Sequence, residues 1–234
     1  PATRRVCRVV DTMNYTFQFG VLAQYQTELL AGLWLTIQLS VVSILLGAAA
    51  GTVLATLRSA SGRVVRALVD GYVELIRNTP FLIQLFLLYY GGPLVGIDLD
   101  ATSAGLLGLA VYGGAYYAEI MRGGFAAVPR GHVEAATMAG LSRVQTLRRI
   151  LLPEMALLIL PAAVNMAVVL MKETAVLSII TVPELTMVIT GIGSSTFAFT
   201  EAAFLLALTY WALTEATGAA GRFLERRVAQ VRLA

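Results

Sequence analysis

The stretch LLAGLWLTIQLSVVSILLGAAAGTVLATL occupies residues 29–57 and contains no charged side chain. About 17 to 25 apolar residues are enough for an α-helix to cross the hydrocarbon core of a bilayer. Within it, Gly47 and Gly51 have the G-x-x-x-G spacing that lets a membrane helix pack closely against a neighbour. The stretch therefore predicts a transmembrane helix that opens the fold.

The rest of the chain has the same character. Of the 234 residues, 58% are hydrophobic and 13% are charged, which is more apolar than the composition of a soluble domain, about half apolar. Three further stretches carry no charge and a fourth carries only Glu215; these are residues 78–97, 101–118, 155–171 and 202–221. We expect an all-α, polytopic membrane protein with five transmembrane helices.

Residues 174–200 are apolar enough for a sixth span, but Pro, Glu and Gly interrupt them repeatedly. The basic residues decide between five spans and six, because cytoplasmic loops are enriched in Lys and Arg. Of the 17 Lys and Arg residues, three lie in 58–66, five in 122–149 and four in 222–232. Five spans place all three groups in the cytoplasm, with the N-terminus out and the C-terminus in. We therefore expect residues 174–200 to be a short, broken helix, buried in protein or lining a cavity.

The chain is predicted to be one domain. Residues 1–16 form an N-terminal extension. Its Arg4, Arg5 and Arg8 would lie outside the cell in this topology, which is opposite to the preference of basic residues for the cytoplasm. Residues 17–234 form a single transmembrane domain with a cytoplasmic loop at about 122–153.

Several kinds of site are absent from the sequence. Cys7 is the only cysteine and His132 the only histidine, which excludes an internal disulfide and sites built from several Cys or His ligands. There is no G-x-x-x-x-G-K-[ST] phosphate loop. No module of interleaved aromatic and basic residues indicates nucleic-acid binding. We expect no metal site, no ATPase site and no nucleic-acid partner.

The longest polar interruption reads EAATMAGLSRVQTLRRILLP and occupies residues 134–153. Strong helix formers begin it, and Gly140 can turn the chain after a short helix. Ser142 and Gln145 have the spacing of a capping box, which predicts that a second helix starts there and runs toward Pro153. We expect a helix-turn-helix at the membrane surface that offers Ala135 and Ala136 to a partner.

The pattern Glu134-Ala135-Ala136, three residues, Gly140, nine residues, Ile150, one residue, Leu152-Pro153 resembles the EAA signature of ABC importer permeases. These are the membrane subunits of binding-protein-dependent transporters. Four other stretches are similar to the polar amino acid permeases of that family: residues 32–40, 72–89, 112–124 and 172–185. The resemblance covers residues 17–227, approximately.

The resemblance implies a type I ABC importer permease in a bacterial cytoplasmic (inner) membrane. Its implied partners are two ABC ATPase subunits, a second copy or homologous permease, a substrate-binding protein, membrane lipid and an amino acid substrate. ATP and Mg²⁺ would be bound by the ATPase subunits, and no cofactor by this chain.

The same resemblance implies the roles of the signature residues. Glu134 would make a charge-assisted bond to the ATPase, Ala135 and Ala136 would permit close approach, and Gly140 would supply the turn. The alternative is an amphipathic surface helix without a partner.

Charged residues near predicted spans are the remaining candidates for function. Glu74 and Arg77 are three residues apart, as are Glu119 and Arg122, so each pair can meet on one helical face. Near the cytoplasmic interface we expect structural ion pairs.

Lys172 and Glu173 follow seventeen residues without charge, 155–171, and opposite charges suit a zwitterionic amino acid. Adjacent helical residues point about 100° apart, so both can face one ligand only if the helix breaks near Thr174. Asn165 lies two turns before Lys172 on the same face. These four are predicted substrate-pathway residues. Tyr112 and Tyr116 are candidate lining groups, with helix packing or an interfacial belt as the alternative.

Two other functions are compatible with parts of this pattern. An ion-coupled secondary amino acid transporter could use Lys172, Glu173 and Glu119, but inverted repeats are not apparent. An intramembrane enzyme would need a catalytic set that the scattered acids and single histidine do not supply.

Overall fold

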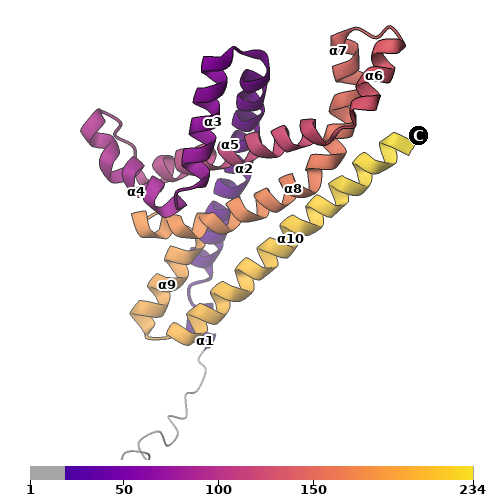
Figure 1. The fold of residues 1–234 in the computed structure, drawn as a ribbon. Coiled ribbons are helices and arrows are strands. Elements are labelled where there is room, and N and C mark those ends of the chain that lie inside the picture. Colours follow the sequence, from indigo (N-terminus) through magenta and orange to yellow (C-terminus); the bar gives the residue numbers. More distant parts are fainter. Residues whose placement is uncertain (1–18, 234) are drawn as a thin grey trace, which may run out of the picture.

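The computed structural model describes residues 19–233, and its regular elements in that range are helices (Figure 1). The first half contains α1 (Phe19–Ala23), α2 (Gln26–Ala60), α3 (Arg63–Arg77), α4 (Phe81–Gly91) and the 3₁₀ helix η2 (Gly92–Val95). The second half contains α5 (Ala101–Ala127), α6 (Arg130–Met138), α7 (Arg143–Thr146), the π-helical turn η3 (Leu147–Leu151), α8 (Leu152–Glu173), the 3₁₀ helix η4 (Thr174–Ile180), α9 (Leu185–Thr196) and α10 (Phe199–Leu233). The predicted extension 1–16 lies outside the described residues.

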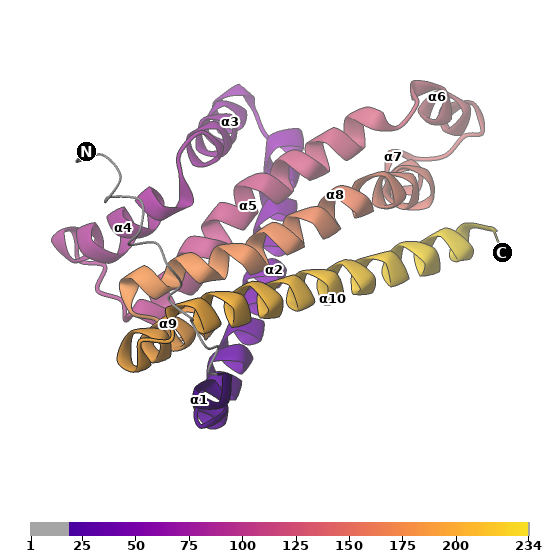
Figure 2. The ribbon, with the colours of Figure 1, turned by 90° about the horizontal axis from the view of Figure 1, so that it is seen from below.

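Four long helices form the body of the fold. Figures 1 and 2 show α5, α8 and α10 running beside one another, with α2 crossing them, and α5 packs on both α2 and α8. The largest buried cluster lies where α2, α4, α5 and α8 meet and includes Leu39, Leu85, Leu109 and Leu170. The expected all-α class is therefore confirmed.

Two glycines permit the crossing of α2 over α5. A Cβ placed on Gly47 would lie 3.2 Å from the backbone of Gly113, and one on Gly51 would lie 2.5 Å from the Cβ of Tyr117. Both distances are shorter than ordinary van der Waals contact. The G-x-x-x-G stretch therefore serves close helix packing, as predicted.

Helix length and composition distinguish the predicted spans. Within the described residues, 26–59 and 143–180 are both long and apolar enough to cross a membrane. α5 and α10 have 27 and 35 residues, which also exceeds the length that a span requires. Residues 78–97 contain a helix shorter than the charge-free stretch, α4, which the 3₁₀ helix η2 continues to Val95. α4 has only 11 residues, about 16 Å at 1.5 Å per residue.

The local sequence explains why the second predicted span is short. Pro80 is the N-cap of α4, and the chain changes to a 3₁₀ helix at Gly92, one residue before Pro93. Gln84 stabilises the bend between α3 and α4, because its Nε2 donates to the carbonyls of Ile76 at 2.8 Å and Thr79 at 3.0 Å. Polar capping and proline thus override a continuous apolar pattern.

Residues 174–200 form two short helices separated by a turn, as predicted. Thr181 in this turn and Phe197 after α9 have positive φ angles of 65° and 58°. The side chains of Leu177, Ile180 and Val182 are fully buried. One side of the broken helix is therefore packed against protein, whereas Thr190, Ser194 and Phe197 are exposed.

The ends of the helices sort to two sides of the molecule. The turn between α2 and α3, the α6–α7 pair and the end of α10 lie toward the upper and right-hand side of Figure 1, whereas α1 and α9 lie at the bottom. These three regions, with the adjoining end of α5 and η3, contain the three groups of basic residues noted in the sequence.

Candidate functional site

The polar interruption forms a projecting pair of short helices, α6 and α7 (Figure 1). After α6, the N–H of Gly140 donates to the carbonyl of Thr137 at 3.0 Å, and the N–H of Leu141 donates to that of Ala136 at 3.1 Å. This pair of bonds is a Schellman turn. Gly140 has a φ of 75°, which a residue with a Cβ adopts only at a cost. The predicted turn at Gly140 is confirmed.

Of the three α6 residues expected to face a partner, two are exposed and one is buried. Glu134 and Ala135 are exposed, and Met138 is 90% exposed. Ala136, however, is only 2% exposed, so the expectation that it faces a partner is wrong. α6 packs on α7 and η3, and the small side chain of Ala136 lets it lie close to them.

A continuous helical path leads from this turn into the body of the fold. Ser142 and Gln145 form the predicted capping box at the start of α7. Near Pro153 the helix widens into a π turn, in which the N–H of Leu152 bonds to the carbonyl of Leu147. Proline has no N–H for the normal helical bond, and a π turn is one way for the helix to accommodate it. The path then continues as α8 to Glu173.

A side-chain contact joins α6 directly to α8. His132 Nδ1 lies 2.7 Å from Glu154 Oε2. The His132 side chain is 47% exposed and that of Glu154 is 14% exposed. His132 thus contacts the first turn of α8 as well as solvent.

The predicted ion pairs are partly rearranged. Glu119 and Arg122 pair as expected, with Arg122 Nε donating to Glu119 Oε2 at 2.8 Å. The prediction that Arg77 pairs with Glu74 is wrong, because within residues 19–233 its ion pair is with Glu119, at 3.5 Å. The packing of α3 on α5 brings Arg77 to a carboxylate that sequence spacing cannot indicate.

These charges surround a polar cavity of about 430 Å³ between α3 and α5. Arg77 also lies 5.5 Å from the centre of the Tyr116 ring, within the range of a cation–π contact. The nine lining residues are Arg58, Asp70, Val73, Glu74, Arg77, Asn78, Tyr116, Glu119 and Arg122.

The predicted pathway residues on α8 separate into accessible and buried groups. Asn165 and Lys172 are exposed, and Glu173 is half-buried. Thr174 is fully buried and donates to the carbonyl of Met171 at 2.7 Å, so its prediction as a lining residue is wrong. α8 ends at Glu173, and the expected break at this point is confirmed.

The two tyrosines contact each other but have different surroundings. Their ring centres are 4.7 Å apart. Tyr112 is 8% exposed, and its ring lies 5.2 Å from that of Phe81, which is the helix-packing alternative. Tyr116 is partly exposed at the polar cavity and is the better lining candidate.

Comparison with known families shows to which protein family the chain belongs. The sequence model of the family described as "Binding-protein-dependent transport system inner membrane component" matches residues 26–230. The chain belongs to this family. These proteins are ABC transporter permeases, so the resemblance seen in the EAA pattern is confirmed.

Relatives of this permease agree along nearly their whole length. YckA of Bacillus subtilis, a probable amino-acid ABC transporter permease, is 33% identical over 92% of this chain and 96% of its own. HisQ of Escherichia coli, the permease of a histidine/lysine/arginine/ornithine transport system, is 33% identical over 85% of this chain and 92% of its own.

Solved structures have the same fold. A crystal structure of an amino acid ABC transporter with histidines superposes with a TM-score of 0.85 at 32% identity, covering 91% of this chain and 100% of the other. The inward-facing MetNI methionine transporter gives a TM-score of 0.70 at 22% identity, over 88% and 98%, which supports the fold alone.

One buried polar cluster of the permease was not identified as a site by the sequence reasoning. Glu184 is fully buried and caps α9, accepting from the N–H groups of Thr186 and Met187 at 2.9 Å each. The hydroxyl of Tyr210 on α10 donates to it at 3.0 Å. Thr36 on α2 lies 3.4 Å away and accepts from Leu185 N–H at 3.0 Å. The available signal was a carboxylate within a long apolar stretch.

We call Glu184, Thr36, Thr186 and Tyr210 the Glu184 cluster. It joins α2, α9 and α10, and the hydroxyl of Tyr210 lies 3.5 Å from that of Thr174, the residue after α8. Buried polar groups that are fully hydrogen-bonded specify one arrangement of the helices around them. The cluster therefore holds the broken segment in place next to Lys172 and Glu173.

Proposed function

We propose that this chain is the permease subunit of an ATP-driven importer that moves an amino acid across a bacterial cytoplasmic membrane by alternating access. The observation that carries the proposal is the continuous series of helices α7, η3 and α8, which leads from the exposed helix α6 to Lys172 and Glu173. It connects a surface suited to a soluble partner with charges that suit a zwitterion. The names of the curated relatives support an amino acid as the substrate.

The proposed coupling begins at α6. Glu134, Ala135 and the turn at Gly140 fit into a groove of an ABC ATPase subunit, which binds ATP and Mg²⁺. Closure of two such subunits moves α6, and the helix over residues 143–173 transmits the displacement as a rigid body. The contact between His132 and Glu154 (2.7 Å) keeps α6 attached to α8 during this motion.

The proposed substrate route passes the end of α8. A soluble binding protein delivers the amino acid from outside, and the permease works as a pair with a second copy or a homologous permease. Lys172 contacts the substrate carboxylate and Glu173 its ammonium group. Asn165 and Tyr116 line the inner part of the route.

The proposed topology has five spans, an external N-terminus and a cytoplasmic C-terminus. The location of α1 and the end of α10 on different sides of Figure 1 supports it.

In intact cells, an impermeant maleimide should label Cys7, the only cysteine. In a C7S variant, a cysteine added at the C-terminus should react only after permeabilisation. Labelling of that tail cysteine in intact cells would indicate six spans.

Reconstitution tests the function directly. The permease, its ATPase subunits and its binding protein are placed in vesicles, and uptake of radiolabelled amino acid is measured. We expect uptake only with ATP at the ATPase side and binding protein at the other. Uptake driven by a proton gradient without ATP would instead support the ion-coupled secondary transporter.

A further inference from the structure

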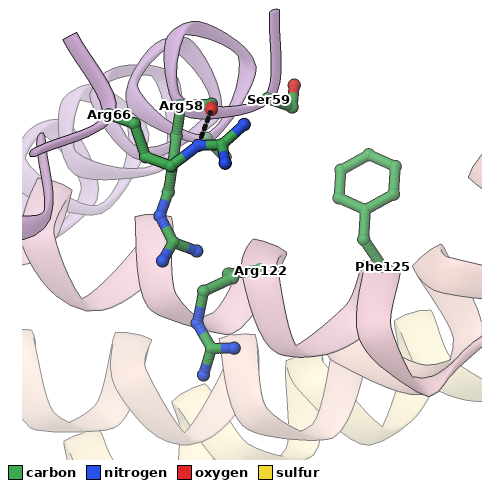
Figure 3. A pocket seen from close by; sticks show the side chains of 6 residues that line it. Arg58, Ser59, Arg66, Arg122 and Phe125 are labelled. Atoms are coloured by element: carbon green, nitrogen blue, oxygen red, sulfur yellow. Dashed lines mark hydrogen bonds between the residues drawn. The ribbon is translucent and has the colours of Figure 1, made fainter. Parts of the chain in front are cut away.

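A second cavity, of about 270 Å³, lies where the end of α2 meets the start of α3 and the last turns of α5 (Figure 3). Arg58, Arg66 and Arg122 line it, one from each of these helices. Its other lining residues are Ala55, Ser59 and Phe125. We call it the arginine cavity.

Positive charge exceeds negative charge around the arginine cavity. Arg58 pairs with Asp70 through its Nε, and Arg122 pairs with Glu119, which Arg77 shares. Glu74 lies in the adjoining polar cavity. The four arginines here, Arg66 included, thus outnumber the three carboxylates, Asp70, Glu74 and Glu119.

Arg66 supplies the surplus charge. Its Nε donates to the carbonyl of Arg58 at 3.4 Å, drawn as the dashed line in Figure 3. Within residues 19–233 it forms no ion pair. A guanidinium has five N–H donors in a planar fork that matches phosphate oxygens. Arg66 therefore keeps donors for an anion beside those of Arg58 and Arg122.

The surroundings of the cavity are apolar, which favours an amphiphile over a soluble anion. Phe125 forms part of the wall and is 39% exposed. On α3, next to Arg63 and Arg66, Val64 and Leu68 are 74% and 69% exposed. A helix with exposed apolar side chains beside arginines is typical of the membrane interface. In the topology of the proposed function, on which this inference rests, that interface is the cytoplasmic one.

We propose that the arginine cavity binds the phosphate of an anionic phospholipid from the cytoplasmic leaflet. Arg66, Arg58 and Arg122 contact the headgroup, and an acyl chain lies against Phe125. Basic pockets between membrane helices on the cytoplasmic side suit such headgroups. The bound lipid joins α2, α3 and α5, and through Arg122 it adjoins the Glu119 pairs of the polar cavity.

The test uses the complete transporter in nanodiscs of phosphatidylcholine with a small fraction of phosphatidylglycerol. Lipids retained after extraction are counted by native mass spectrometry. We expect the wild type to retain phosphatidylglycerol, and R66Q to retain at least tenfold less, since a hydrogen bond to a charged group is worth about 1.5 to 3 kcal/mol. R63Q is the matched control, because Arg63 is an exposed arginine of the same helix that does not line the cavity. It should retain the wild-type amount.

Equal retention by wild type and R66Q, or equal losses in R63Q and R66Q, would overturn the proposal. Displacement of the lipid by millimolar inorganic phosphate would assign the cavity to a soluble anion and overturn it too. Retention by the permease alone but not by the complete transporter would mean that an acidic surface of the ATPase occupies the cavity instead.

Two further measurements keep the outcome clear. If R66Q does not assemble, two results must still hold. The wild type must retain more phosphatidylglycerol than phosphatidylcholine, and R66K must retain more phosphatidylglycerol than R122Q. Uptake is measured in parallel. ATP-driven uptake without a lipid preference contradicts only the lipid site, whereas absence of ATP-driven uptake in both lipids contradicts the proposed function.

Discussion

The α6–α7 pair and the Glu184 cluster are both polar interruptions of an apolar chain, but they are built differently. In the α6–α7 pair the turn and cap bonds join residues at most five positions apart, and Glu134 is exposed. In the Glu184 cluster the bonds join residues 36, 184 and 210, and Glu184 is fully buried. Local hydrogen bonds leave a surface free for a partner, whereas long-range ones hold helices together.

The largest effect should follow from breaking the buried region with Glu184→Ala. The N–H groups of Thr186 and Met187 would lose their acceptor, whereas the hydroxyl of Tyr210 would keep its contact with that of Thr186 at 3.1 Å. Leaving two buried donors unsatisfied should lower the free energy of unfolding by about 3 kcal/mol or more. We expect a lower melting temperature and loss of assembled complex in size-exclusion chromatography. E184Q keeps an acceptor oxygen and should lose less; an unchanged melting temperature in E184A would contradict the structural role.

Gly140→Val should affect the exposed region without affecting the buried one. A β-branched residue at a φ of 75° is strained by about 1 to 2 kcal/mol or more, so the turn after α6 should be lost. We expect uptake driven by ATP to fall at least tenfold, with the melting temperature of the transmembrane body nearly unchanged.

The control for Gly140→Val is Gly140→Asn, since asparagine tolerates the left-handed region. It should retain more uptake. Normal uptake together with normal co-purification of the ATPase subunits in G140V would rule out the coupling role of α6.

Lys172→Ala tests the end of α8, which lies between the α6–α7 pair and Glu184 in the sequence. Loss of one charge-assisted hydrogen bond to a substrate carboxylate, about 1.5 to 3 kcal/mol, should lower uptake at least tenfold. Assembly should be normal, because Lys172 is exposed. K172R should keep most of the uptake. Disassembly of K172A without a specific transport defect would favour a structural role.

His132→Ala should have the smallest effect. It removes the contact with Glu154, worth about 0.5 to 1.5 kcal/mol for a typical hydrogen bond. Glu154 has a further interaction in the fold, so it would keep a partner. We expect uptake to fall about two- to threefold, and H132Q, which can still donate, to behave like the wild type. A loss as large as that of G140V would mean that this contact, more than the turn, attaches α6 to α8.

The sequence predicted local features well where a few neighbouring residues decide them. Gly140, the Ser142–Gln145 cap and the break after Glu173 are confirmed, since each depends on φ preference or on bonds within one turn. The helix α4 is shorter than the charge-free stretch 78–97, because an apolar run does not show the change to a 3₁₀ helix at Gly92.

The errors in the candidate site have a common cause. Arg77 pairs with Glu119 rather than Glu74, Ala136 faces its own chain, and Thr174 is buried. Each depends on which helix lies opposite, and residue spacing within one helix carries no such information.

By itself, the sequence determined that the chain is an apolar, helical permease with an exposed polar loop. Apolar runs must be buried in lipid or protein, and the EAA pattern is local. Only the tertiary structure decided where α3 brings its arginines against α5, and how Glu184 joins three helices. Those contacts exist because helices distant in sequence cross at close range, as Gly32 permits for α2 and α9 next to Glu184.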